Sequence, residues 1–165
     1  MKPVSATELL ASASVAAMAL TGCGGGAPAQ PSLAERQWID NAAGLIANLG
    51  DGVVLSASGG NDIQSARRAL HDESDLYAMV IAYTRFGGCR QTMLNLGAPN
   101  ARLRSVEQAL ETACRRFERA SALFTVAVER DDANVLLTAT RTALKASPLL
   151  YRAEAELNAV RASRG

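Results

Sequence analysis

From Ser32 onward, apolar side chains recur at every third or fourth position, which is the period of a helix with one buried face. Ser32 and Glu35 fit a capping box, in which each side chain satisfies a backbone N–H at the helix start. The apolar positions that follow are Leu33, Trp38, Ala42, Leu45, Ile46 and Leu49. We expect residues 50–52 (Gly-Asp-Gly) to loosen or end this helix and Gly59-Gly60 to break the chain. The run 53–58 fits either a continued helix or a short extended piece.

The capping signature recurs at Asn61 and Gln64 and predicts a second, short helix. The polar cluster 72–75 either restarts that helix or only decorates it, and a longer helix then runs to about Leu96. The apolar face of this longer helix consists of Met79, Ala82, Tyr83, Phe86, Cys89, Met93 and Leu96. Gly87-Gly88 lies in its middle, where each glycine costs about 1 kcal/mol relative to alanine. We therefore expect a kink there, or the close approach of another helix.

Residues 97–100 (Gly-Ala-Pro-Asn) predict a turn between helices, with glycine as the stop and asparagine as the next cap. The helix after this turn has the most regular pattern in the chain. Its apolar face consists of Leu103, Val106, Leu110, Cys114, Phe117, Ser121, Phe124 and Val128.

The next turn is marked by Asp131-Asp132, a pair that is more typical of helix caps than of catalytic carboxylates. The final helical stretch carries Leu136, Ala139, Ala143, Leu150, Leu157 and Val160. Ser147-Pro148 either begins a new helix, with proline in the first turn, or kinks a continuous one. No run predicts a strand and no repeat is apparent, so the patterns predict an all-α fold: an antiparallel bundle of about four helices over residues 32–165.

Composition sharpens this picture of the domain. The chain is 48% hydrophobic but only 4% aromatic, and much of the apolar fraction is alanine, which indicates closely packed helices with few bulky side chains. Its 17 Lys+Arg balance 16 Asp+Glu. That balance argues against nucleic acid as a partner, because phosphate binding needs a surplus of cations. It also argues against a polybasic hold on anionic lipid.

The residues before the domain follow the plan of a secretory signal. Lys2 supplies the positive charge, residues 9–20 form an uncharged and largely apolar run, and small residues follow. The run is too short to cross a bilayer core of about 30 Å, which needs about 20 apolar residues. The tetrapeptide Leu20-Thr21-Gly22-Cys23 then resembles the lipobox of bacterial lipoproteins.

The resemblance implies that residues 1–22 are a signal peptide removed by a dedicated peptidase, and that Cys23 becomes the first mature residue. Its thiol would carry a lipid with acyl chains such as palmitate, anchored to the outer face of the cell membrane, or to an outer membrane if the organism has one. Residues 23–31, rich in glycine and proline, would form a flexible tether. The mature part is loosely similar to small helical lipoproteins of GC-rich bacteria. The alternative is an ordinary signal peptide, with Cys23 there by chance.

With Cys23 lipidated, two cysteines remain, and both lie on apolar faces of consecutive helices. Antiparallel packing brings those faces together, and thiols oxidise outside the cytoplasm, so we expect a Cys89–Cys114 disulfide. Cys114 lies several residues further from the turn than Cys89, so the pairing needs a crossing angle or the glycine kink. The alternative is a pair of buried free thiols.

The sequence offers little that predicts catalysis or a cofactor. His71, the single histidine, is followed by Asp72 and Glu73, and this pattern is more typical of a solvated helix end than of a metal site, which needs three or four convergent ligands. No serine or thiol can be identified that would complete a triad with it. We therefore predict no metal, no cofactor and no enzymatic activity.

Two further groups of residues have a functional and a structural interpretation. The first group either lines a ligand pocket or belongs to the core, and helical spacing favours the core; it consists of Tyr77, Tyr83, Phe86 and Met93. The second group forms either an anion patch or a solvated face paired with Glu111 and Glu118, and the interspersed acids favour the latter; it consists of Arg115, Arg116 and Arg119.

These observations predict a non-enzymatic envelope lipoprotein whose domain binds another protein or has a structural role. The alternative is a small-ligand carrier with a pocket between the helices. A carrier needs a sizeable apolar cavity, whereas a structural module needs a packed interior and an apolar surface patch.

Overall fold

The computed structural model describes residues 32–162, and these form seven α-helices, two short 3-10 helices and no strand. The predicted all-α fold is therefore confirmed. The α-helices are α1 (Leu33–Ser56), α2 (Ile63–His71), α3 (Glu73–Gly87), α4 (Cys89–Leu96), α5 (Arg104–Arg130), α6 (Ala133–Leu144) and α7 (Ser147–Ala162). The predicted signal peptide, the tether and Cys23 lie outside the described residues.

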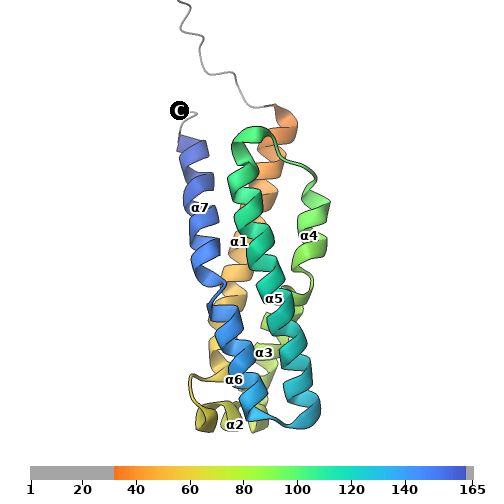
Figure 1. The fold of residues 1–165 in the computed structure, drawn as a ribbon, viewed down its shortest axis with the longest axis vertical. Coiled ribbons are helices and arrows are strands. Elements are labelled where there is room, and N and C mark those ends of the chain that lie inside the picture. The colour runs from red at the N-terminus through yellow and green to blue at the C-terminus, as the bar shows by residue number, and fades with distance from the viewer. Residues whose placement is uncertain (1–31, 163–165) are drawn as a thin grey trace, which may run out of the picture.

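The helices form an antiparallel bundle of four columns, as predicted (Figure 1). One column is α1, the next is α3 continued by α4, the third is α5, and the last is α6 continued by α7. Each column packs against its neighbours: α1 contacts α3 and α7, and α5 contacts α3, α6 and α7. The short helix α2 closes one end of the bundle, and α1 begins at the opposite end, where α7 stops (Figure 1).

Residues 50–52 are predicted to loosen or end α1, and the structure shows that the helix does not end there. The helix continues to Ser56, so residues 53–56 are helical, and a 3-10 turn follows over Ala57–Gly59. A Cβ atom on Gly52 would lie 2.8 Å from Cε1 of Phe86, so this glycine permits the close approach of α3. The expected break comes at Gly60, whose φ of +77° lies in the region that favours glycine.

Side-chain caps start the helices close to where the sequence indicates. Ser32 Oγ accepts a hydrogen bond from the backbone N–H of Glu35 at 3.1 Å, as the capping box requires. The second cap is Asp62 and not Asn61. Its Oδ1 accepts from the backbone N–H of Ser65 at 3.0 Å, and hydrogen bonds of this kind lower the pKa of Asp62.

The two acidic turns are also caps. Asp72 Oδ1 accepts from the backbone N–H of Asp75 at 2.9 Å, so the cluster at 72–75 restarts the chain as α3. Asp132 Oδ1 accepts from the backbone N–H of Asn134 at 2.8 Å and starts α6. At the other ambiguous site, Ser147-Pro148 begins α7 as a separate helix with proline in its first turn.

The interior combines a few aromatic rings with many alanines. Tyr83 stacks on Phe124 with ring centroids 4.3 Å apart, and Phe86 stacks on Phe117 at 4.4 Å. Elsewhere the helices meet through buried alanines, including Ala42, Ala82, Ala113, Ala120, Ala139, Ala143 and Ala153.

Two positions predicted to lie on buried faces are exposed: Leu33, with 80% exposure, and Val128. Both lie in the terminal turn of a helix, Leu33 at the start of α1 and Val128 near the end of α5. Neither belongs to the buried core of the bundle. None of the helices from 32 to 162 has the length and hydropathy needed to cross a membrane.

Candidate functional site

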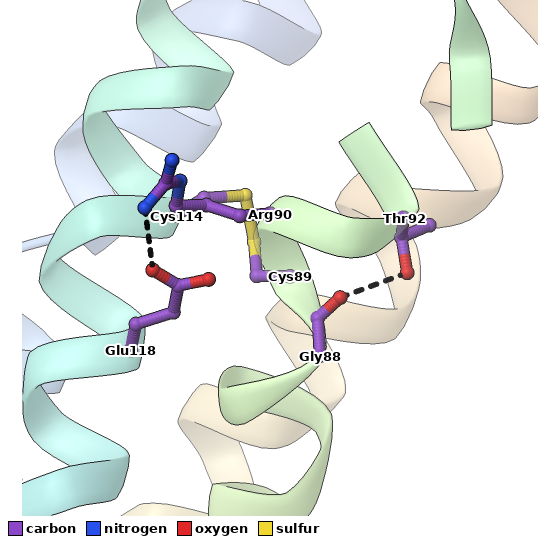
Figure 2. Close-up of a disulfide and its surroundings, with 6 residues drawn as sticks. All are labelled: Gly88, Cys89, Arg90, Thr92, Cys114 and Glu118. Carbon is purple, nitrogen blue, oxygen red and sulfur yellow. Dashed lines mark hydrogen bonds and ion pairs between the residues drawn. A yellow bond between two sulfur atoms is a disulfide. The ribbon is translucent and has the colours of Figure 1, made fainter. Parts of the chain in front are cut away.

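The predicted cysteine pair is formed. Cys89 and Cys114 are joined by a disulfide that links α4 to α5, with their Cα atoms 5.2 Å apart and both residues fully buried (Figure 2). The sequence predicted that this pairing needs either a crossing angle between the helices or a kink at the glycines. The helix is interrupted at Gly88, which separates α3 from α4 directly before Cys89.

Polar contacts fix the chain on both sides of this disulfide. Arg90 Nη1 lies 3.7 Å from Glu118 Oε2, and Thr92 Oγ1 donates to the carbonyl oxygen of Gly88 at 3.1 Å (Figure 2). A Cβ atom on Gly87 would lie 3.0 Å from Ser121 Oγ. Both alternatives predicted for the glycine pair therefore occur: the helix breaks at Gly88, and α5 approaches closely at Gly87.

His71 lies where its sequence context predicts, at the solvated end of a helix. It is the last residue of α2, its side chain is 62% exposed, and its Nε2 lies 3.6 Å from Asp131 Oδ1. Within the described part of the chain, no three histidine, cysteine, aspartate or glutamate side chains gather closely enough to hold a metal ion.

The remaining candidates divide between core and surface. Tyr83 and Phe86 are core residues, and Met93 is half-buried against the core. Tyr77 is exposed, outside the core, and borders an open surface hollow together with Asp72, Glu73 and Ser74. Burial raises the pKa of Tyr83 to about 12, and the Thr140 hydroxyl 3.3 Å from the phenol opposes this shift.

Two of the three basic residues predicted to form either an anion patch or a salt-bridged face have partners within the domain, and the third, Arg119, is exposed. Arg115 Nη1 lies 3.5 Å from Glu111 Oε1, as the salt-bridged interpretation predicts, whereas Glu118 pairs with Arg90 of α4. Arg116 is used differently, because its Nη1 donates to the carbonyl oxygen of Lys145 at 2.6 Å and so ties α5 to the junction of α6 and α7.

The surface feature that sequence patterns missed is a groove between α1 and α7, with a volume of about 200 Å³. Its floor includes the buried side chains of Ile46, Leu150 and Leu157. On the α1 side its wall includes three small residues, Ala43, Ala47 and Gly50, and also Val53. Two large side chains border it and remain mostly in solvent, Val54 with 73% and Tyr151 with 70% exposure.

Polar groups mark the length of this α1–α7 groove. Near the end of the bundle where α1 begins, Arg161 Nη2 bridges to Asp40 Oδ1 at 3.1 Å and ties α7 to α1. At the other end, Ser147 Oγ is buried without a hydrogen-bond partner among the described residues. Glu154 lies between them on α7. The groove is thus an apolar trough with a polar rim.

The chain was compared with protein-family models, with curated proteins and with solved structures, and nothing among them matches it.

Proposed function

We propose that this chain is an extracytoplasmic lipoprotein whose helical domain binds another envelope protein. The lipid on Cys23 would hold it to the outer face of the cell membrane, or to an outer membrane where the organism has one. The observation that carries the proposal is the buried Cys89–Cys114 disulfide. Disulfides persist in exported proteins and are rare in the cytosol. The lipobox resemblance of Leu20-Thr21-Gly22-Cys23 supports the same compartment.

The anchor follows from the chemistry of Cys23. Each buried CH₂ of an acyl chain contributes about 0.8 kcal/mol, and two or more chains give stable membrane attachment where one is marginal. The chain next to Cys23, residues 24–31, contains three glycines and two prolines and no charge. Such a composition suits a spacer between a lipid surface and a domain.

The role that we propose for the domain is binding without catalysis. The disulfide consumes both Cys89 and Cys114, so neither thiol is a nucleophile. His71 lies at the exposed end of α2, and its Nε2 lies 3.6 Å from a carboxylate oxygen of Asp131, which is also exposed. The α1–α7 groove is lined mainly by apolar side chains, which favours the docking of a partner's apolar side chains.

A small-ligand carrier is the second candidate, and it would bind its ligand in the same groove. Its volume of about 200 Å³ is below the roughly 300–1,000 Å³ of pockets that enclose a drug-sized ligand. A protein partner therefore suits the groove better than an enclosed ligand does. Native mass spectrometry of the purified domain separates the two, because a carrier should retain a small molecule.

The anchor is tested by replacing Cys23 with alanine in cells that are fed labelled palmitate. The wild-type chain should take up the label and sediment with membranes, whereas Cys23→Ala should take up none and remain uncut. A Cys89→Ala/Cys114→Ala double variant is the matched control, since it removes two cysteines and should keep the label. Label in the Cys23→Ala protein would contradict the anchor.

A further inference from the structure

The charges beside the α1–α7 groove leave one carboxylate without a partner. Arg161 is paired with Asp40 at 3.1 Å, and Arg152 with Glu156 at 2.7 Å. Glu154 lines the groove and is exposed, and no residue from 32 to 162 pairs with it. An occupant of the groove would therefore meet an apolar floor and one uncompensated negative charge.

The shape of the groove suits a helix. Its α1 wall carries Ala43, Ala47 and Gly50 at helical spacing, and a Cβ atom built on Gly50 would meet nothing within 4 Å. Small side chains let two helix axes approach to about 8 Å. The α7 wall runs from Ser147 to Arg161, which corresponds to about 21 Å at 1.5 Å per residue. A partner helix of about four turns has the same length.

We propose that the α1–α7 groove binds one amphipathic helix of a second protein. The helix would place an apolar ridge, with residues spaced i, i+3/i+4 and i+7, over Ile46, Leu150 and Leu157, and a lysine or arginine against Glu154. Val54 and Tyr151, which border the groove, would be covered at the same time. This inference rests on the proposed function, because it specifies the partner of the protein-binding domain.

A second copy of the chain fits the groove less well. Where two copies meet groove to groove about a two-fold axis parallel to α7, Glu154 of one copy lies level with Glu154 of the other. The two negative charges would repel, and the neighbouring cations are already paired. A surface of anionic lipid is disfavoured for the same reason.

The test uses the full-length chain in the cells that make it, with the photo-crosslinker p-benzoylphenylalanine in place of Tyr151 or Val54. The matched control carries the crosslinker in place of Tyr77, which is 68% exposed but lies on α3, outside the groove. We expect positions 151 and 54, and not 77, to crosslink to the same segment of a different protein. That segment should have the apolar helical spacing and a lysine or arginine within one turn of the crosslink.

A charge swap tests the role of Glu154. The Glu154→Lys variant should lower the crosslink yield at position 151 at least fivefold, and changing the partner's lysine or arginine to glutamate should restore it. Glu129→Lys is the control, because Glu129 is an exposed acid of α5 that does not line the groove. Circular dichroism of each variant checks that the helices remain.

The inference is overturned by a crosslink between two copies, by a crosslink to lipid alone, by no crosslink at 151 and 54, or by a yield that Glu154→Lys does not change. Crosslinking to a partner at position 77 alone would leave the proposed protein-binding role standing and remove the groove from it. Absence of a protein partner at all three positions would contradict the protein-binding role itself.

Discussion

Between α3 and α5 the bundle is filled by aromatic rings, and the disulfide from α4 to α5 extends this contact. Between α1 and α7 the bundle instead leaves an open groove. On the first side, Tyr83 and Phe86 of α3 stack on Phe124 and Phe117 of α5, and the disulfide follows one turn later. On the second side, the α1 wall of the groove includes the small residues Ala43, Ala47 and Gly50, and α7 is tied to α1 at one end by the Arg161–Asp40 pair.

Two glycines of α1, two residues apart, show this difference within a single helix. A Cβ atom on Gly52 would lie 2.8 Å from the Phe86 ring, whereas one on Gly50 would meet nothing within 4 Å. The same residue type therefore fits a crowded contact on one face and lines free space on the other. We infer that the α3–α5 side, together with the disulfide to α4, holds the domain together, and we call it the sealed side. The α1–α7 side, which we call the open side, is available for recognition.

The largest effect should come from breaking the sealed side at its disulfide. The bond closes a loop with a sequence separation of 25 residues, and the chain entropy of such a loop corresponds to about 3.5 kcal/mol. The Cys89→Ala/Cys114→Ala variant should therefore have a Tm roughly ten degrees or more below the wild type. Differential scanning calorimetry measures the shift.

A thiol titration of unfolded, unreduced wild-type protein is the companion measurement for this prediction. Cys89 and Cys114 should not react with a thiol reagent before reduction and should both react after it. Two reactive thiols before reduction, in protein exported by its natural route, would show that packing alone holds the α3–α5 side together.

The next effect concerns Tyr83, at the centre of the sealed side. Burial raises its pKa to about 12, compared with about 10 in an unfolded chain, so the folded state favours the neutral phenol. The raised pKa contributes to the free energy of unfolding below pH 10, and this contribution is lost as the pH rises through 12. The loss between pH 9 and pH 12 should be roughly 2 kcal/mol. Urea unfolding at pH 9 and pH 12 measures this loss in the wild type and in Tyr83→Phe. Between these two pH values, the free energy of unfolding should fall by roughly 2 kcal/mol more in the wild type than in the variant. Equal losses in the two proteins would mean that the phenol ionises without cost to the fold.

The sealed side could be predicted from the sequence because its signals are local and periodic. The apolar spacing on residues 79–89 and 103–124 placed Cys89 and Cys114 on facing stripes, and Gly87-Gly88 marked the break that aligns them. The caps at Ser32, 72–75 and 131–132 were equally local, because a short polar side chain reaches only its own helix start.

The open side could not be predicted in the same way. Periodicity indicates which face of a helix is buried, but it does not indicate how closely two distant helices approach. Residues 50–52 illustrate this limit, because their glycines predict a loosened or ended helix, whereas α1 continues and Gly52 accommodates the Phe86 ring from α3. The groove depends on the distance between α1 and α7, which are about one hundred residues apart in the chain, and Glu154 gave no signal of its own.

The smaller effects compare the two glycines directly. On the sealed side, Gly52→Ala places a methyl group within 3 Å of the Phe86 ring, and overpacking of this kind costs about 1–3 kcal/mol. Alanine also has the higher helix propensity, which offsets up to about 1 kcal/mol of this cost. Gly52→Ala should therefore lower the free energy of unfolding by roughly 1–2 kcal/mol. A double-mutant cycle with Phe86→Leu, measured by urea unfolding, tests this cause. Gly52→Ala should lower the free energy of unfolding less in the Phe86→Leu background than in the wild type. Full additivity would show that the ring is not the cause.

On the open side, Gly50→Ala should have the opposite sign. Its methyl group meets no atom within 4 Å, so only the helix propensity changes, and the domain should become more stable by about 0.5–1 kcal/mol. Gly44→Ala is the matched control, because a Cβ atom there also meets nothing within 4 Å but Gly44 does not line the groove. Both variants should raise the midpoint of urea unfolding by similar amounts. Only Gly50→Ala adds a methyl group to the wall against which the proposed partner helix packs, so it alone should reduce crosslinking at position 151. If Gly50→Ala destabilises the domain, the space beside Gly50 is already filled in the folded protein, and the two sides of the bundle are packed alike.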